Sequence, residues 1–357
     1  MKRYFRELIV TLVFSLTVVG ITGATIIKKT IKLFTPKEEV SDVNKGHELE
    51  KEKHKEKTNK VNDLVNGFTE DLAGKEEGAK AATKISKAAS MGISIDNPQV
   101  LLGKEDWLFY KTTEDGDPMS DYQGINHYSD EKIAAIASKL EQYKQIFNSY
   151  GKEFYVMSIP NKSNVYPEYM PDSVERADTT TRTDLFMDYL QNNTDIGVIN
   201  CKQDLIDAKS KYQVYYSSDT HFNDIGAFVA SQTVLSVVTG QKDSLDKVKF
   251  NVTNENYSGD LAALCEMSDI FNEDTSYQLD TSTIDASKKS DKRVLIIGDS
   301  FSDVIQPVLA NYFADVTAVG VWSYHMYDLD SYAPDIVIWE NAERYTDRFD
   351  WINITKG

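Results

Sequence analysis

From Pro98 onward, short apolar runs alternate with segments of helical spacing, and this alternation constrains the fold more than any other feature. Several runs are continuously apolar, which is typical of strands buried on both faces of a parallel sheet. We predict strands over Phe154–Ile159, Ile196–Ile199, Val214–Tyr216, Val294–Ile297, Val316–Val321 and Asp335–Trp339, and helices over Ser129–Tyr150, Thr181–Leu190, Asp224–Val238 and Asp303–Phe313. The pattern predicts a three-layer α/β domain with a mainly parallel sheet and an active site at the carboxyl ends of its strands.

The N-terminal region contains a run of 20 residues, Leu8 to Ile27, without a charged side chain. As a helix rising about 1.5 Å per residue, it would cover the roughly 30 Å hydrocarbon core of a bilayer. We therefore predict that residues 1–30 form a cytoplasmic tip and one N-terminal transmembrane helix. The protein would then be a single-pass protein of the cell membrane with its remaining residues extracytoplasmic. A cleaved signal peptide is the alternative, because Thr22, Gly23 and Ala24 offer a processing site.

Residues 31–97 have a different composition from the rest of the chain. Between Lys28 and Asn97 the only aromatic residues are Phe34 and Phe68, and the stretch 48–60 is almost entirely charged. Such a segment buries too little apolar surface to offset its ordering entropy, so we predict a charged tether or helical spacer. Residues 98–357 hold all 4 tryptophans and are long enough for one large domain with a substantial core.

Charge is distributed unevenly along the chain. The net charge is −17, but residues 1–37 carry +6, and the residues from Pro98 on include 22 basic and 42 acidic side chains. Because phosphate binding needs clustered Lys and Arg, this acidity argues against nucleic acid as a partner. It also disfavours a strongly anionic polymer. Cys201 and Cys265 are too few for a disulfide-dense scaffold or a four-cysteine zinc site, and the sequence leaves open whether they bond.

A Gly298-Asp299-Ser300 motif follows the apolar run Val294–Ile297 and precedes a helical segment. A serine at that point lies beside a helix N-terminus, where backbone N–H groups can stabilise a developing oxyanion. Aspartate and serine are also ordinary helix-capping residues. The motif by itself therefore allows either a nucleophile or a cap.

Asp219 and His221 lie two residues apart in a polar segment before a predicted helix. A serine hydroxyl becomes a good nucleophile when a base removes its proton, and an acid must hold that base in one tautomer. Asp219 can orient His221, and His221 can activate Ser300. The alternative is that Asp219 caps the helix and His221 is a surface residue. No metal is predicted here, because no further ligands follow at local spacing.

Polar residues also gather at the end of the predicted strand Asp335–Trp339. The side-chain amide of Asn341 could donate to an oxyanion. Glu340, Glu343 and Arg344 could equally form the salt-bridged start of a helix.

Together these residues resemble the SGNH hydrolase superfamily, which has a Gly-Asp-Ser nucleophile block and a block containing Asp and His. Most of its members place the serine block first, whereas here Asp219 and His221 precede Ser300. Reading from Ser300 to the C-terminus and then onward from Phe154 restores the common order. The chain is thus similar to a circularly permuted domain of the SGNH/flavodoxin-like fold.

The permuted order with Asp-x-His resembles the SGNH-like proteins that acetylate alginate and related polysaccharides, and their relatives the DHHW proteins. Other stretches agree with this resemblance: Leu102–Tyr110, Asp121–Gly124, Ile159–Lys162, Tyr166–Tyr169 and Glu343–Arg344. Two departures are Phe222, where a tryptophan often follows the histidine, and the lack of a recognisable carbohydrate-binding module.

The resemblance implies a membrane-anchored, extracytoplasmic O-acetyltransferase for a cell-surface polysaccharide. Ser300 would carry the acetyl group as an acyl-enzyme, with His221 as base and acid and Asp219 orienting it. Supporting or oxyanion roles would fall to the Ser300 N–H and to Asn341, Arg344 and Asn161. No cofactor or metal is expected, and a multipass membrane acyltransferase would relay the acetyl donor. A carbohydrate acetylesterase of the same fold and a non-catalytic glycan-binding or assembly subunit are the alternatives.

Overall fold

The computed structural model describes residues 97–269, 271–324 and 328–350. The predicted transmembrane helix and nearly all of the predicted tether lie outside these residues. Among the helices that are described, none combines the length and apolar character of a membrane span.

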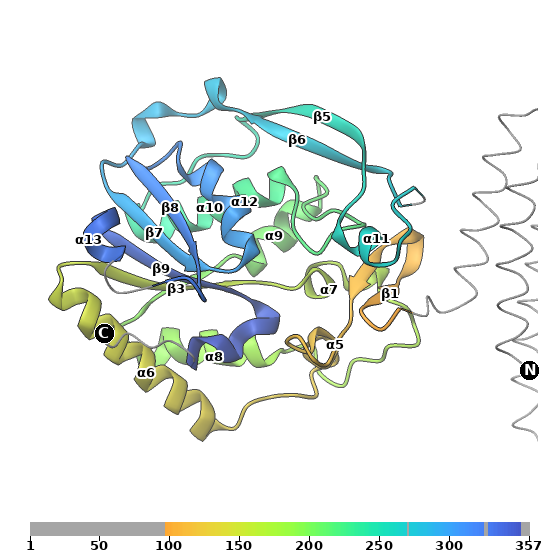
Figure 1. Ribbon diagram of the computed structural model, residues 1–357, viewed down its shortest axis with the longest axis horizontal. Coiled ribbons are helices and arrows are strands. Elements are labelled where there is room, and N and C mark those ends of the chain that lie inside the picture. Colours follow the sequence, from red (N-terminus) through yellow and green to blue (C-terminus); the bar gives the residue numbers. More distant parts are fainter. Residues whose placement is uncertain (1–96, 270, 325–327, 351–357) are drawn as a thin grey trace, which may run out of the picture. The chain divides into compact units, whose positions relative to one another are not determined.

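A five-stranded parallel sheet forms the centre of the domain, in the spatial order β4-β3-β9-β7-β8 (Figure 1). Read from β7 through β9 and then onward from β3, this order becomes 2-1-3-4-5, the order of flavodoxin-like sheets. The predicted mainly parallel sheet is confirmed, and its strand order matches a permuted chain. The strands are β3 (Glu153–Ile159), β4 (Gly197–Asn200), β7 (Arg293–Gly298), β8 (Asp315–Gly320) and β9 (Ile336–Ala342).

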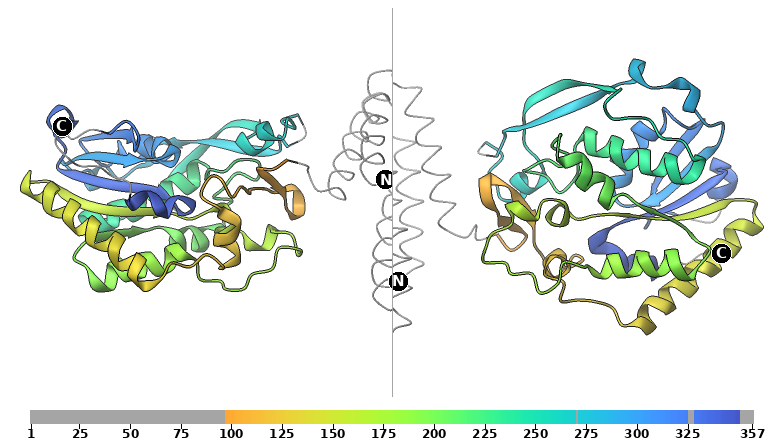
Figure 2. Two further views of the ribbon diagram at one scale, coloured as in Figure 1. Left: turned by 60° about the horizontal axis from the view of Figure 1, so that its bottom comes forward. Right: turned by 180° about the vertical axis from the view of Figure 1, so that it is seen from behind.

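Successive side chains of the strands enter two separate cores, one on each face of the sheet. Ile296 and Ile338 belong to the core shared with helices α9, α10 and α12, whereas Leu295 and Val337 belong to the core shared with α6 and α8. Figures 1 and 2 show the helices packed around the central sheet. The three predicted layers are therefore confirmed. The helices are α9 (Lys202–Lys209), α10 (Asp224–Thr239), α12 (Ser300–Leu309), α6 (Asp130–Ser149) and α8 (Arg182–Asn193).

Local capping explains where the predicted helices begin. The Ser129 side chain accepts a hydrogen bond from the Lys132 N–H at the start of α6, and Thr181 and Asp184 form a capping box at the start of α8. Helix α12 begins at Ser300, three residues earlier than predicted. The reason is that Asp299 caps it by accepting a hydrogen bond from the N–H of Phe301.

The predicted strand Val214–Tyr216 is wrong. In the part of the chain that the structure describes, Tyr215 pairs only with Phe222, in an isolated antiparallel bridge. The chain reverses between these two residues, and the Tyr215 hydroxyl donates to the carbonyl of Pro160. A strand needs a neighbour that continues its ladder, and here the neighbour is the returning arm of one loop.

Two antiparallel ribbons lie outside the central sheet. They pair β1 (Val100–Leu102) with β2 (Leu108–Tyr110), and β5 (Lys249–Tyr257) with β6 (Asp274–Asp280). The shorter helices are α5 (Pro118–Gln123), α7 (Lys162–Val165), α11 (Asp260–Leu264) and α13 (Asp328–Tyr332). The 3₁₀ segments are η1 (Lys104–Asp106), η2 (Pro167–Tyr169), η3 (Thr281–Thr283), η4 (Ala286–Lys288) and η5 (Glu343–Asp350).

Candidate active site

The structure brings Ser300, His221 and Asp219 together at the carboxyl end of β7. The His221 Nε2 atom lies 2.7 Å from the Ser300 Oγ atom, and His221 Nδ1 lies 2.8 Å from Asp219 Oδ1. From β7 the chain continues to β8 on one side and later returns to β9 on the other side. The gap between β7 and β9 is therefore the switch point of the sheet, where ligands bind in open α/β folds. The geometry is that of a nucleophile, a base and an acid that orients the base.

Ser300 is exposed at the first position of α12. Two residues before it, the end of β7 lies very close to β9. A Cβ atom on Gly298 would lie 2.3 Å from a carboxylate oxygen of Glu340, so only glycine fits there. That same carboxyl group accepts a hydrogen bond from the Asp299 N–H, and Asp299 Oδ2 accepts one from the Ala342 N–H. These contacts fix the turn that presents Ser300.

Asp219 is buried and accepts four hydrogen bonds through its carboxylate. Both the N–H and the ring nitrogen of His221 contact Oδ1, while the Tyr257 hydroxyl (2.8 Å) and the Asp260 N–H (3.0 Å) donate to Oδ2. Burial alone would raise the pKa of Asp219, but these bonds and the nearby His221 hold it well below its usual range. Asp219 is therefore ionised and suited to orienting His221.

Lys162 is buried beneath the loop that carries Asp219. Its Nζ donates to the carbonyls of Tyr216 (2.9 Å), Ser217 (2.9 Å) and Asp219 (2.6 Å). Burial lowers the pKa of Lys162 to about 8, although nearby carboxylates favour its charged form. All three donors of the ammonium group are thus used to shape one loop.

Asp274 binds the N–H groups of the same loop. The buried Asp274 carboxylate accepts from the backbone N–H groups of Ser217 (2.8 Å) and Ser218 (2.9 Å), and from both serine hydroxyls. The Ser218 hydroxyl accepts in turn from the Gly259 N–H. The loop that ends in Asp219 is therefore held by a cation at its carbonyls and an anion at its amides.

A small pocket of about 20 Å³ lies beside the triad and includes Tyr110, Asn161, Thr220 and Arg344 among its lining residues. Asn161 and Arg344 follow the carboxyl ends of β3 and β9 and are 5% and 7% exposed. Within the described residues, neither polar atom of the Asn161 side chain has a hydrogen-bond partner, nor does Arg344 Nε. Unpaired buried polar groups are costly, so these side chains have hydrogen-bonding capacity left for a group that enters the pocket.

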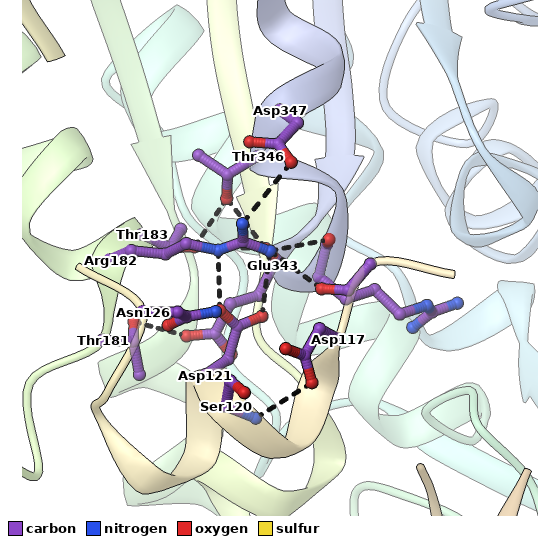
Figure 3. A network of polar contacts seen from close by, with 12 residues as sticks. Asp117, Ser120, Asp121, Asn126, Thr181, Arg182, Thr183, Glu343, Thr346 and Asp347 are labelled. Carbon is purple, nitrogen blue, oxygen red and sulfur yellow. Dashed lines mark hydrogen bonds and ion pairs between the residues drawn. The ribbon is translucent and has the colours of Figure 1, made fainter. Parts of the chain in front are cut away.

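A buried network around Arg182 holds the segment that contains Arg344 (Figure 3). Arg182 Nε forms an ion pair with Asp121 at 2.6 Å, and Arg182 Nη2 donates to the carbonyl of Arg344 at 3.0 Å. Glu343 is buried as well and accepts hydrogen bonds from the Thr181 hydroxyl and the Asn161 N–H. Through Glu343, this network connects the ends of β3 and β9.

Asn341 lies away from the triad. It is fully buried on β9, and its amide is satisfied when it is assigned with the nitrogen toward the Glu340 carbonyl (3.1 Å) and the oxygen toward Trp339 Nε1 (3.1 Å). Asn341 and Trp339 are two residues apart and so share a face of the sheet. Glu340, which lies between them in the sequence, faces Gly298 and the turn that presents Ser300. Among the described residues, no hydrogen bond joins the Asn341 side chain to Ser300, His221 or Asp219.

Asp260 brings another carboxylate to His221. One ligand atom each from Asp219, His221 and Asp260 lie within 4.8 Å of one another, which is close enough to share a cation. Asp219 Oδ1 already accepts from the His221 ring, however, and Asp260 accepts from the N–H of Thr220 and from its hydroxyl. A metal ion would have to displace these bonds, so the arrangement fits a catalytic triad better than a metal site.

Both cysteines are free thiols. Burial raises the pKa of the Cys201 thiol well above its usual range and that of Cys265 to about 11, so neither thiol is activated as a nucleophile.

Phe222, which departs from the pattern of the resembled family, is buried against Phe301 with ring centroids 5.0 Å apart.

Comparison with known proteins identifies the family. The model of the SGNH hydrolase-like domain of acetyltransferase AlgX matches residues 100–322. A probable alginate O-acetylase AlgJ of Pseudomonas putida is 24% identical over 282 residues, which cover 70% of this chain and 70% of that protein.

Two solved structures are also similar to this chain. The O-acetyltransferase domain of Pseudomonas putida AlgJ superposes with a TM-score of 0.47 at 19% identity, covering 70% of this chain and 92% of that domain. A DHHW family protein from Eubacterium siraeum superposes with a TM-score of 0.50 at 14% identity, covering 72% of this chain and 100% of that one.

Proposed function

Because the chain belongs to the family of SGNH hydrolase-like domains represented by acetyltransferase AlgX, we propose that it is an O-acetyltransferase acting on a polysaccharide. The observation that carries this proposal is the contact series from Ser300 through His221 to Asp219, at 2.7 and 2.8 Å. A probable alginate O-acetylase among its relatives supports acetyl as the transferred group and a polysaccharide as the acceptor.

In the first half-reaction, His221 Nε2 removes the hydroxyl proton of Ser300 as the Ser300 Oγ attacks the acetyl carbonyl of the donor. The protonated His221, stabilised by the Asp219 carboxylate, then gives this proton to the departing donor oxygen. The product is acetyl-Ser300. In the second half-reaction, His221 deprotonates a sugar hydroxyl, which attacks the acetyl carbonyl and releases Ser300 with its proton restored.

The tetrahedral oxyanion of each step needs donors that are already in place. The Ser300 N–H is one, because first-turn amides of a helix lack partners within the helix. We assign supporting roles to Asn161 and Arg344, whose side chains lie in the pocket next to Thr220. Asn341, whose amide is used by Trp339 and Glu340, is not part of this assignment.

The setting of the reaction is part of the same proposal. The uncharged run Leu8–Ile27 would anchor the chain in the cell membrane, with the catalytic domain on the extracytoplasmic side. A multipass membrane acyltransferase would relay the acetyl donor. The acidic domain favours a neutral, cationic or zwitterionic acceptor over a strongly anionic one.

Hydrolysis of p-nitrophenyl acetate by the purified full-length chain, with and without oligosaccharide acceptors, tests the proposal. Ser300→Ala should lower kcat/KM by about 10⁴-fold or more, whereas Ser149→Ala, at the far end of α6, should not change it. Acetylated glycan formed from an added acceptor supports a transferase. Release of acetate alone would support the acetylesterase, since water can reach the exposed Ser300. Turnover that survives Ser300→Ala would refute the triad.

A further inference from the structure

Trp322 is an exposed aromatic side chain at the catalytic edge of the sheet. It is 68% exposed, more than any other large hydrophobic residue described, whereas Trp107 and Trp339 are buried. Single exposed apolar residues are common on protein surfaces, so exposure alone carries no function. A function of Trp322 is indicated by its position and by the residues around it.

Trp322 and Ser300 leave neighbouring strands at the same level. Gly298 of β7 is paired in register with Gly320 of β8, and each side chain lies two residues beyond that pair. The Val321 N–H also donates to the Gly298 carbonyl at 3.0 Å. Neighbouring parallel strands are about 4.8 Å apart, so the two chains emerge side by side from one edge of the sheet.

A continuous series of contacts between aromatic rings and guanidinium groups connects Trp322 to His221. Arg348 lies over the indole of Trp322 (5.6 Å) and over the ring of Tyr345 (3.2 Å). Arg344 lies over Tyr345 (4.6 Å) and over Phe301 (5.8 Å). The rings of Phe301 and His221 are 4.7 Å apart.

Asp115 fixes the middle of this series. Its carboxylate accepts from the hydroxyl of Tyr345 at 2.6 Å and pairs with Arg348 at 3.4 Å. Arg348, whose guanidinium lies over Trp322, is therefore held in place by its ion pair with Asp115 and its contact with Tyr345. An exposed, backed indole is a preorganised stacking surface, which lowers the entropic cost of binding a ligand.

We propose that Trp322 is the stacking platform for a pyranose ring of the acceptor polysaccharide. One face of a pyranose carries mainly C–H bonds, which complement the negative face of an aromatic ring. A ring seated there stands next to the edge from which Ser300 emerges. This inference rests on the proposed function, because it assigns a subsite to the acceptor of that reaction.

Calorimetric titration of the full-length chain carrying Ser300→Ala separates binding from turnover. The probes are cellohexaose, chitohexaose and hexamannuronate. Adding Trp322→Ala should weaken binding of the preferred oligosaccharide about tenfold or more, the size of one aromatic stacking contact. Trp322→Phe should largely retain the affinity. Tyr150→Ala removes another exposed aromatic ring, at the end of α6 before β3 begins, and should leave the affinity unchanged.

Unchanged affinity in Trp322→Ala would overturn the inference, as would the absence of binding to all three probes. Thermal melting of each variant shows whether the fold is retained. Ester hydrolysis by the wild-type chain reports on Ser300 separately. A chain that binds oligosaccharide through Trp322 but hydrolyses no ester would refute the proposed reaction and leave the platform standing.

Discussion

Lys162 and Asp274 hold opposite sides of the same short loop, the lysine through its carbonyls and the aspartate through its amides. Neither residue forms a hydrogen bond with the side chain of Ser300, His221 or Asp219 among the contacts that the structure describes. The loop ends in Asp219, whose own carbonyl is one of the three that Lys162 binds. We infer that Lys162 and Asp274 together set the position of Asp219, the residue that orients His221 in the proposed triad.

Lys162→Met should lower kcat/KM by about 10- to 100-fold and destabilise the fold by about 3 kcal/mol, because three buried carbonyls lose their donor. Initial rates with p-nitrophenyl acetate and urea unfolding measure the two effects. Lys209→Met is the matched control, since Lys209 contacts the Val165 carbonyl and Glu168. Wild-type activity in Lys162→Met would show that the loop keeps its shape without the hydrogen bonds from Lys162.

The pH dependence of activity provides a second test of Lys162. Its folded-state pKa of about 8 lies below the ordinary 10.5, so the side chain is charged in both states below pH 8. Between about pH 8 and 10.5 only the unfolded chain keeps the proton, and this group's contribution to stability rises with pH. In the same window the folded lysine has two N–H donors for three carbonyls. Activity should therefore fall above pH 8 while stability does not, and Lys162→Arg should remove that fall.

Tyr257→Phe should reduce kcat/KM about tenfold. The hydroxyl of Tyr257 is a donor to the ionised Asp219, and a hydrogen bond to a charged group is worth about 1.5–3 kcal/mol. Tyr216→Phe is the control, because Tyr216 stacks on Tyr257 but donates to Asp224.

The same Tyr257→Phe variant should also unfold at a higher pH in an acid titration. The folded pKa of Asp219 is depressed, so its contribution to stability is present above the unfolded value of about 3.9 and is lost as pH falls through the folded value. Loss of the Tyr257 donor moves the folded value upward. Circular dichroism across pH 2–6 measures this, and an unchanged acid transition would contradict the role of the hydroxyl.

Asn161→Ala and Asn341→Ala should have opposite effects. We expect Asn161→Ala to lower kcat about 10- to 100-fold with little change in stability, because its amide has no partner in the described structure. Asn341→Ala should destabilise by about 1–3 kcal/mol and leave the activity of the folded fraction intact, because its amide pairs with Trp339 and Glu340. Kinetics corrected for the folded fraction distinguish the two, and the reverse result would return the oxyanion role to Asn341.

Arg182→Met should destabilise the domain by about 3–5 kcal/mol, since it leaves the buried Asp121 without its cation. Arg293→Met removes an exposed ion pair with Asp315 and should cost at most about 1 kcal/mol. Denaturant midpoints of the two variants make the comparison. Equal midpoints would show that the Arg182 network does not hold the end of β9 in place.

The parts of the fold that sequence reasoning predicted correctly are those with local causes. The helix from Asp130 to Ser149 follows from one apolar stripe and a serine cap, and the apolar runs of β3, β7 and β9 follow from burial on both faces. The structure also brings Ser300, His221 and Asp219 together, as the chemistry of a triad requires, and their catalytic roles stay a prediction.

The residues that sequence reasoning missed act through long-range contacts. Lys162 meets its carbonyls 54 to 57 positions away, and Asp274 meets Ser217 at a separation of 57. No local pattern marks such partners. The orientation of Asn341 was recoverable, because its two-residue spacing from Trp339 places both on one face of the strand.

The central position of β9 has a consequence for how the protein is made. Of the strands described, β9 is synthesised last, yet it pairs with both β3 and β7 in the middle of the sheet. Until Ile336–Ala342 has been made, the pairs β3–β4 and β7–β8 each carry an open edge, which is a site for aggregation. Between the synthesis of Ser300 and that of β9, the nascent chain therefore holds its serine, histidine and aspartate without a joined sheet to align them. Chaperone binding to such chains should persist until the ribosome has passed the codons for β9.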